Sequence, residues 1–389
     1  MRRTGIASIL AGVLVFASGC ATTSTRQSFV RTGDPIIDGK AAIEHGPEKD
    51  RVLWQYRTGL AAMRRSNYEE AERFFDDALL RVGSVLGGGP DKSAKKSRGY
   101  FSEEAKKTFL GEPYERVMAY FYRGILYWMD GEPDNARACF RNAQIQDSDT
   151  DNREYSNDWV LMDYLDGFVT AKYFGGDGSD ARERADESFK LGELPPYSKN
   201  ANTMVFLEFG KGPMKYATGE YGEELRIRPG KSAVQGAWLK VANQAVRIAP
   251  YDDVNYQATT RGGRVMDHIL ANKAVFKSAT DDFGTAAIIG GAVVASHSRN
   301  AEVGLGLVAA GILSKVIAGA TTPDADTRAW ENLPGYISFT ALELPPGPHT
   351  ATVEFTDAAG NVMPSLTKTI HFTVSAGDDA VLFASDRNT

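Results

Sequence analysis

The spacing of apolar residues changes character along the chain. Between about 51 and 200, apolar residues recur every three or four positions, which is the period of amphipathic helices. From 203 onward, short β-branched and aromatic runs are separated by turns containing Gly and Pro, which predicts strands. From about 264 to 320 the helical period returns, with two runs rich in Gly and Ala. The pattern therefore predicts an α+β protein with a helical front half and a β-rich back half interrupted by a helical hairpin.

Two segments of the helical half carry small and aromatic residues at matching offsets. They are Gly59, Ala62, Ser66, Ala71, Phe75 and Ala78, and then Gly124, Tyr127, Gly131, Ala136, Phe140 and Ala143. In tetratricopeptide repeats (TPRs), small residues at this spacing let two antiparallel helices approach, and the Phe fills the crevice between them. A third, degenerate copy is predicted from Trp159 to Phe189, with Gly167 and Ala181 or Ala185 as its small residues. We therefore predict a TPR-like repeat domain over 50–200.

Stacked repeats of this kind form a concave groove that typically receives an extended or helical peptide. We expect Tyr120, Arg123 and Tyr127 of the second copy to be binding residues in that groove. The alternative is that the helices pack only against the rest of this chain, because three or more repeats are normally needed for stability. The repeats thus predict either a partner-binding surface or a purely internal packing unit.

The β-rich half, 201–389, contains runs with strand composition on both sides of the insertion. Before it we predict strands at 203–209, 224–228, 244–248 and 256–260, and after it at 336–342, 349–355, 367–374 and 380–384. The alternation within the second group predicts a sheet with one buried face, and we expect one sandwich-like domain. Because each Gly/Ala run of the insertion is shorter than the roughly 20 apolar residues of a membrane span, we favour a buried or oligomer-forming hairpin over membrane insertion.

The first residues have the composition of an export signal. Arg2 and Arg3 precede an apolar run, and three small residues stand directly before Cys20. This arrangement resembles the lipobox of bacterial lipoproteins, in which the cysteine thiol is alkylated by a diacylglycerol. We predict a signal peptide over 1–19 and a lipidated tether over 20–49, the alternative being a plain secretory signal with a chance cysteine. The residue after the anchor, Ala21, is not the Asp that holds many such proteins at the inner membrane, so the outer membrane is favoured.

Charge and cysteine content narrow the function classes. The chain has 44 Lys and Arg against 50 Asp and Glu, and losing Arg2 and Arg3 with the signal would take its net charge from −6 to −8. This balance, without a basic stripe, argues against nucleic acid as a partner. Once Cys20 carries lipid, only Cys139 remains, so no intrachain disulfide is expected and Cys139 fits a small core residue.

No catalytic set is recognisable in the sequence. None of the five histidines stands at metal-ligand spacing, and no Gly-x-Ser-x-Gly elbow is present. In the run Gly89-Pro90-Asp91-Lys92-Ser93, Asp91 would repel the phosphates that a nucleotide-binding loop cradles. We therefore expect no catalytic residues, cofactor, nucleotide or metal. The acidic segment from Asp147 to Asp158 partly matches a calcium loop, but a solvated acidic linker is the favoured interpretation.

Several short segments together resemble an uncharacterised family of Gram-negative lipoproteins with TPR-like repeats. The segments are Gly111-Glu112-Pro113-Tyr114-Glu115-Arg116, Val205-Phe206-Leu207-Glu208-Phe209-Gly210 with Gly212-Pro213, Asp326-Thr327-Arg328-Ala329-Trp330 with Leu333-Pro334, and Leu344-Pro345-Pro346-Gly347-Pro348-His349. The resemblance implies no established activity, and relatives look like partners of envelope or cell-wall assembly systems.

From the anchor, the repeats and the resemblance, we expect a lipoprotein on the periplasmic face of the outer membrane that acts as a protein-interaction scaffold. One alternative is an envelope enzyme or ligand carrier with its site between the repeat and β domains. Another is a pore- or assembly-forming element built on the glycine-rich hairpin.

Overall fold

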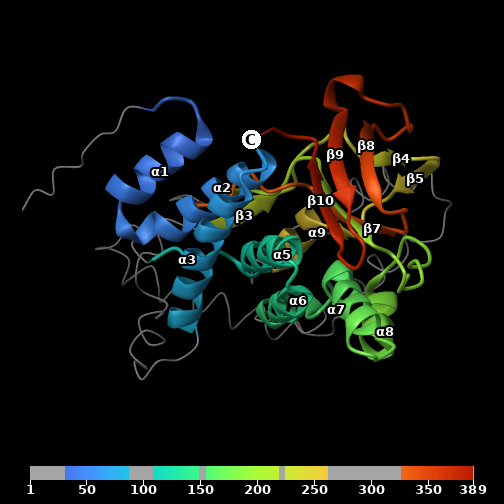
Figure 1. Ribbon diagram of the computed structural model, residues 1–389. Coiled ribbons are helices and arrows are strands. Elements are labelled where there is room, and N and C mark those ends of the chain that lie inside the picture. The colour runs from blue at the N-terminus through green and yellow to red at the C-terminus, as the bar shows by residue number, and fades with distance from the viewer. Residues whose placement is uncertain (1–30, 87–107, 149–154, 219–223, 262–325, 389) are drawn as a thin grey trace, which may run out of the picture.

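The computed structural model describes residues 31–86, 108–148, 155–218, 224–261 and 326–388 (Figure 1). Within these ranges the chain has a mixed α+β architecture with eight α-helices and three small sheets, so the predicted fold class is confirmed at this level. The predicted signal peptide, Cys20 and the hairpin at about 264–320 lie outside the described residues.

The helices fall into consecutive pairs, α2 with α3, α5 with α6, and α7 with α8. Their bounds are α1 (Pro35–His45), α2 (Arg51–Arg64), α3 (Tyr68–Leu86), α5 (Pro113–Met129), α6 (Pro133–Asp147), α7 (Val160–Tyr173), α8 (Ser179–Ser188) and, within the β-rich half, α9 (Val254–Arg261). Proline is found in the first turn of α1, α5 and α6, where it has no hydrogen bond to break.

The repeated glycines lie where the sequence pattern predicted. A Cβ atom at Gly59 would come within 3.2 Å of the Phe75 ring, and one at Gly124 within 2.6 Å of Phe140. Each glycine therefore makes room for the phenylalanine of the partner helix in the same way. The third pair differs, because the residue packed against Gly167 is Tyr197, which follows the pair. The finer assignment to tetratricopeptide repeats stays a prediction.

Part of the predicted tether is a helix that packs on the helical layer. The side chain of Asp34 accepts hydrogen bonds from the first free amides of α1, and its other oxygen pairs with Arg65 at the end of α2 at 2.5 Å. Gly39 of α1 lies directly against Thr58 of α2. The prediction of a tether throughout 20–49 was therefore wrong for 35–45, which belongs to the folded body.

Strands from both sides of residues 262–325 pair within the same sheets. The strands are β1 (Thr203–Phe209), β2 (Met214–Thr218), β3 (Glu224–Arg228), β4 (Gly236–Val241), β5 (Gln244–Ile248), β6 (Asp252–Asp253), β7 (Tyr336–Leu342), β8 (Gly347–Thr356), β9 (Lys368–Val374) and β10 (Ala380–Ser385). One sheet has the order β10-β1-β7-β6, the next is the β2-β3 hairpin, and the third has the order β5-β4-β8-β9. Because β1 pairs with β7 and β10, and β4 pairs with β8, the β-rich half cannot be divided into two separate domains at residues 262–325.

One predicted strand, 256–260, is instead the helix α9. Asp253 accepts hydrogen bonds from the amides of Asn255 and Tyr256, as an N-terminal cap does. The hydroxyls of Thr259 and Thr260 both donate to the Tyr256 carbonyl, so the β-branched residues that suggested a strand are satisfied within a helix. The strands β2, β4 and β6 were not predicted.

Strand β1 lies between the helices and the β5-β4-β8-β9 sheet, because its residues alternate between two buried cores. Its residues Met204 and Phe206 belong to the core shared with the helices, whereas Val205, Leu207 and Phe209 belong to a second core shared with the other sheet. The molecule therefore has three layers, namely helices, the β1 sheet and the β4 sheet. The predicted boundary near 200 does not separate two independent cores, and the sandwich assignment stays a prediction.

Candidate functional site

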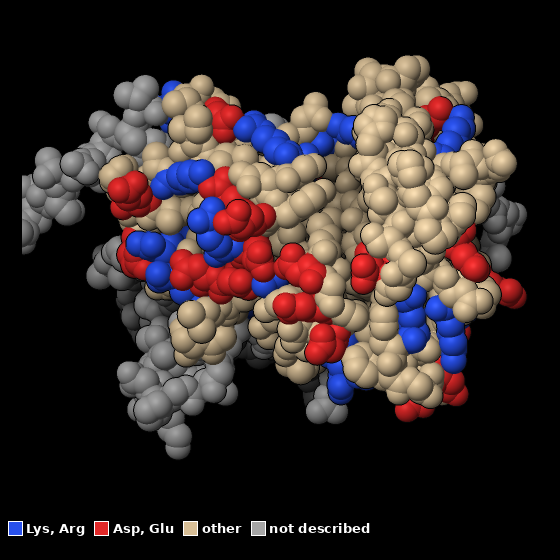
Figure 2. Space-filling model, in the orientation of Figure 1, with Lys and Arg blue, Asp and Glu red and all other residues tan. Residues whose placement is uncertain are grey.

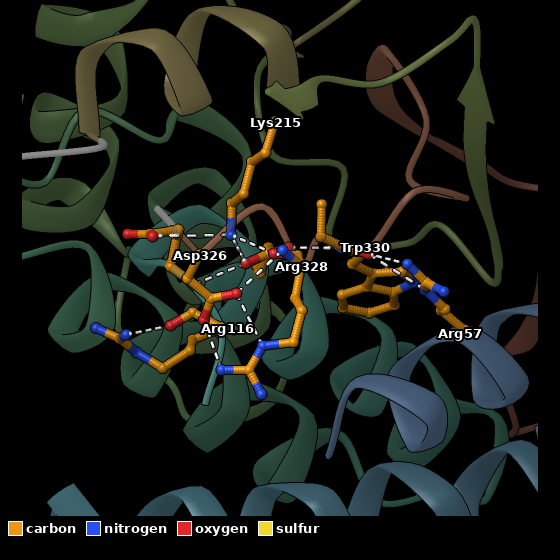
Figure 3. Close-up of polar contacts among 10 residues, drawn as sticks. Arg57, Arg116, Lys215, Asp326, Arg328 and Trp330 are labelled. Atoms are coloured by element: carbon orange, nitrogen blue, oxygen red, sulfur yellow. Dashed lines mark hydrogen bonds and ion pairs between the residues drawn. The ribbon is translucent and has the colours of Figure 1, made fainter. Parts of the chain in front are cut away.

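Three of the sequence segments that carried the family resemblance come together in space. At the first turn of α5, Glu115 is fully buried. Its carboxylate meets groups from both sequence halves, among them Lys215 and Trp330, which are labelled in Figure 3. One oxygen accepts the amide of Trp330 at 2.6 Å. The other accepts the amide of Glu112 at 2.7 Å, which closes a capping box, and the ammonium of Lys215 at 2.9 Å. The segments are joined further along by the amide of Gly212, which donates to the Leu333 carbonyl.

Lys215 enters this cluster from β2 with only 3% of its side chain exposed. Its ammonium also donates to the Arg328 carbonyl at 3.1 Å and lies 3.7 Å from Glu112. Burial disfavours the charged form, but the carboxylates of Glu115 and Glu112 outweigh that effect and raise the pKa of Lys215 above its usual value. Lys215 is therefore held as a cation, which is the opposite of what a nucleophilic lysine needs.

Arg328 fastens the segment 326–330 to the helical layer. Its guanidinium binds Asp326 at 2.6 Å and Asp50 at 2.7 Å, and these carboxylates raise the pKa of Arg328 against the effect of burial. Two residues further on, the Trp330 ring stacks on Tyr56 of α2 with centroids 4.6 Å apart. Arg57 of the same helix donates to the Ala329 carbonyl at 2.5 Å.

A second buried ion pair ties α2 and α5 to β1. Arg64 and Glu208 have side chains with no exposed surface, and their Nε and Oε1 atoms are 2.5 Å apart. The hydroxyl of Tyr122 donates to the other oxygen of Glu208. Glu208 lies inside the Val205–Gly210 segment, so this pair also involves a motif of the resemblance.

These buried charges are arranged to hold elements together. Both oxygens of Glu115 and both oxygens of Glu208 accept hydrogen bonds from the protein itself. Breaking a buried pair is costly because it leaves an uncompensated charge, so each pair fixes one arrangement of helices against sheet. The sequence analysis identified these segments but did not predict that they contact one another, because they are separated by about a hundred residues or more.

The interface between the helices and the first sheet is filled with aromatic rings. Phe121 and Trp128 of α5 lie 6.1 Å and 6.0 Å from Phe206 of β1, measured between ring centroids. Phe339 of β7 packs 5.5 Å from Phe168 of α7. The faces of α5 and α7 that carry these rings are therefore covered by the chain's own sheet, which agrees with the alternative that the helices pack against the rest of this chain.

The three predicted binding residues lie on the opposite side of α5. Arg123 is bound by Asp76 at 2.6 Å and by Glu72 at 2.8 Å, both on α3. Its guanidinium lies 3.4 Å from the centre of the Tyr127 ring. Tyr120 is half-buried on this side and packs at the margin of the helical core. The structure thus brings Arg123 and Tyr127 together, while Tyr120 contributes mainly to packing.

The surroundings of Arg123 are strongly acidic. Figure 2 shows red side chains forming a band over α3 and α5. Within it, burial and the nearby Asp130 and Asp76 raise the pKa of Glu72, although Arg123 acts in the opposite direction. We call Glu72, Asp76 and Asp130, with Arg123 and Tyr127, the acidic strip. Its carboxylates come from segments some 50 residues apart, which is why composition alone did not indicate it.

The other sequence candidates lie in ordinary structural surroundings. Cys139 is buried, and desolvation raises the pKa of its thiol to about 12, so it is not activated. Of the possible calcium loop, Asp149, Asp151 and Asn152 lie outside the described residues. Its end residues are engaged with the protein: Asp147 accepts the amide of Asp158 at 3.2 Å, and Asp158 accepts from Gln257 at 2.7 Å. In the described part of the chain, no cluster of three or more His, Cys, Asp or Glu is placed to hold a metal.

Comparison with protein-family models, with curated proteins and with solved structures found no match. The resemblance to a lipoprotein family therefore stays a prediction. In the described ranges, every helix is too short or too polar to cross a lipid bilayer.

Proposed function

We propose that this protein is a non-catalytic lipoprotein, anchored through Cys20 to the periplasmic face of the outer membrane, that acts as a scaffold for a protein partner in the cell envelope. In this proposal the three helix pairs are TPR-like repeats and the two four-stranded sheets form a sandwich-like unit. Its main support is that the buried charges of Glu115 with Lys215 and of Arg64 with Glu208 are paired with one another, so that these groups hold helices and sheet in one arrangement.

The acidic strip is the partner surface that we propose. The inner side of the repeats is covered by the β1 sheet, which leaves the outer side for a partner. On that side, Tyr127 supplies a ring already fixed by Arg123, and Asp76 is half exposed. Tyr is enriched among the residues that dominate binding energy at interfaces, and Arg123, which is buried, serves to hold the Tyr127 ring in place. The surrounding carboxylates favour a partner segment rich in Lys or Arg.

The surface proposal is tested by affinity isolation from detergent-solubilised envelopes. The test variant combines Tyr127→Ala with Asp130→Lys, which removes the ring over Arg123 and reverses a charge while leaving the Glu115–Lys215 and Arg64–Glu208 pairs unchanged. Asp378→Lys, in the exposed turn between β9 and β10, makes the same charge change on another part of the surface. We expect partners to be lost with the first variant and kept with the second. Identical partner lists for wild type and both variants would remove the acidic strip from consideration.

The anchor is tested separately by mass spectrometry of the N-terminal peptide from the native producer. We expect a diacylated Cys20 at the new N-terminus and, for Cys20→Ala, release of the protein from the membrane fraction. An intact leader or an unacylated cysteine would contradict the anchor and would leave the surface proposal untouched.

A further inference from the structure

The outer face of the β5-β4-β8-β9 sheet carries a tryptophan that the core does not use. Along β4, Ala237 and Leu239 point into the core between the sheets, so Trp238 and Lys240 point away from it. Trp238 belongs to neither buried core and is partly exposed, whereas three of the five Trp residues, at 128, 159 and 330, are fully buried. A partly exposed indole combines a wide apolar surface with a polar N–H group, a combination that is enriched at binding interfaces.

Cross-strand pairing surrounds Trp238 with hydrogen-bonding side chains. On β5 its direct neighbour is Arg247, and on β8 it is Glu354. In the next row, Lys240 pairs with Thr352, which in turn pairs with Thr369 on β9. The result is a flat face with one aromatic ring and hydroxyl, carboxylate and cationic groups beside it.

Some of these polar groups are already fixed in place. Lys240 and Glu354 form an ion pair at 2.7 Å, although Lys240 is half exposed. One row further, the hydroxyl of Thr350 and Nδ1 of His371 are 3.0 Å apart. Groups held in this way lose little further freedom when they bind a ligand, which lowers the entropic cost of binding.

We propose that this face binds a polysaccharide strand, with one pyranose ring stacked on Trp238 and its hydroxyl groups bonded to Glu354, Lys240 and the threonines. A sugar ring has an apolar C–H face that suits the indole surface and a rim of hydroxyls that suits the polar neighbours. A lipid surface would need more apolar side chains than Trp238 alone. A nucleic acid would need a cationic face, whereas here Lys240 is neutralised by Glu354.

This surface lies on the layer farthest from the acidic strip, so the proposal is independent of the protein partner and of the lipid anchor. A scaffold that holds a protein on one side and a glycan on the other would place its partner at the polysaccharide layer of the envelope.

The test is calorimetric titration of the purified full-length protein in detergent with three tetrasaccharides: chitotetraose, cellotetraose and maltotetraose. We expect saturable binding of at least one of them, and a loss of affinity of at least tenfold for Trp238→Ala. Trp238→Phe, which keeps a ring, should retain part of the affinity. Trp54→Ala is the matched control, because Trp54 is also partly exposed but lies on α2, with the Arg57 guanidinium 5.2 Å from its ring.

Thermal unfolding of each variant checks that the fold is kept, which is expected because Trp238 contributes to neither core. The absence of saturable binding to all three sugars overturns the proposal. So does equal binding by wild type and Trp238→Ala, or an equal loss with Trp54→Ala.

Discussion

The clearest physical prediction concerns Asp252, a carboxylate at the joint between the helical and β layers. It lies on β6, is 4% exposed, and accepts the amides of Val160 and Leu161 at 2.9 Å each, which caps the start of α7. Burial is the largest influence and raises the pKa of Asp252 to about 7. The two amide hydrogen bonds oppose this, while the charges of Asp158 and Asp163 add to it.

The direction of the pH effect follows from proton binding. In the unfolded chain an Asp titrates near pH 4, so between about pH 4 and 7 the folded protein binds more protons at Asp252 than the unfolded chain does. Its contribution to stability is therefore fully present below pH 4 and is lost as the pH rises through 7. A difference of about three pKa units corresponds to about 4 kcal/mol over the whole range.

The assay is urea unfolding of wild type and Asp252→Asn at pH values from 4 to 8. The asparagine side chain stays neutral and keeps one acceptor oxygen. The substitution therefore removes the titration of residue 252 while leaving a hydrogen-bond acceptor that caps α7. We expect the stability of Asp252→Asn relative to wild type to increase with pH, by up to about 4 kcal/mol, and to level off above pH 7.

For a matched variant, Asp177→Asn, we expect the stability difference from wild type to change with pH in the opposite direction. The exposed Asp177 has its pKa lowered by hydrogen bonds from Ser179, so Asp177→Asn should lose stability relative to wild type as the pH rises through the Asp range. If the difference between Asp252→Asn and wild type were flat with pH, or fell as for Asp177→Asn, burial would not be the dominant influence on Asp252 and our reasoning would be refuted.

Three further predictions concern stability. Lys215→Met leaves the charge of Glu115 unpaired in the core and should lower the free energy of chemical unfolding by about 3–5 kcal/mol. Adding Glu115→Gln should restore part of the loss, and strict additivity of the two changes would contradict the buried pair. Ala242 has a φ of +50°, so Ala242→Gly should raise the unfolding free energy by about 0.5–1 kcal/mol, and a decrease would show that the turn relaxes around alanine. Gly124→Ala should lower the melting temperature more than Gly59→Ala, because the added methyl group would meet a ring at 2.6 Å instead of 3.2 Å, and the reverse order would mean that the second helix pair is the looser one.

Two errors of sequence interpretation had local signals that could have corrected them. Asp34-Pro35 is a cap followed by a first-turn proline, and it marks the start of α1 inside the predicted tether. Asp253 likewise stands directly before the first residue of α9 and caps this helix by accepting the amide of Asn255. The β-branched residues of the same segment had suggested a strand. In both cases a short capping signal was outweighed by composition over a longer window.

The sequence by itself determined the local elements. The offsets from Gly59 to Phe75 and from Gly124 to Phe140 specify close helix pairs. The apolar runs at 203–209 and 336–342 specify buried strands. Both can be predicted because the helix and strand periods depend on residues that are neighbours in the sequence. Only the tertiary structure decided what those elements pack against. A strand such as β1, which carries apolar residues on both faces, does not encode which partner covers each face. The carboxylate of Glu115 binds Lys215, which lies a hundred residues later in the chain. The covered faces of α5 and α7, the acidic strip and the outward-facing Trp238 all result from this long-range packing, which depends on how whole surfaces fit together.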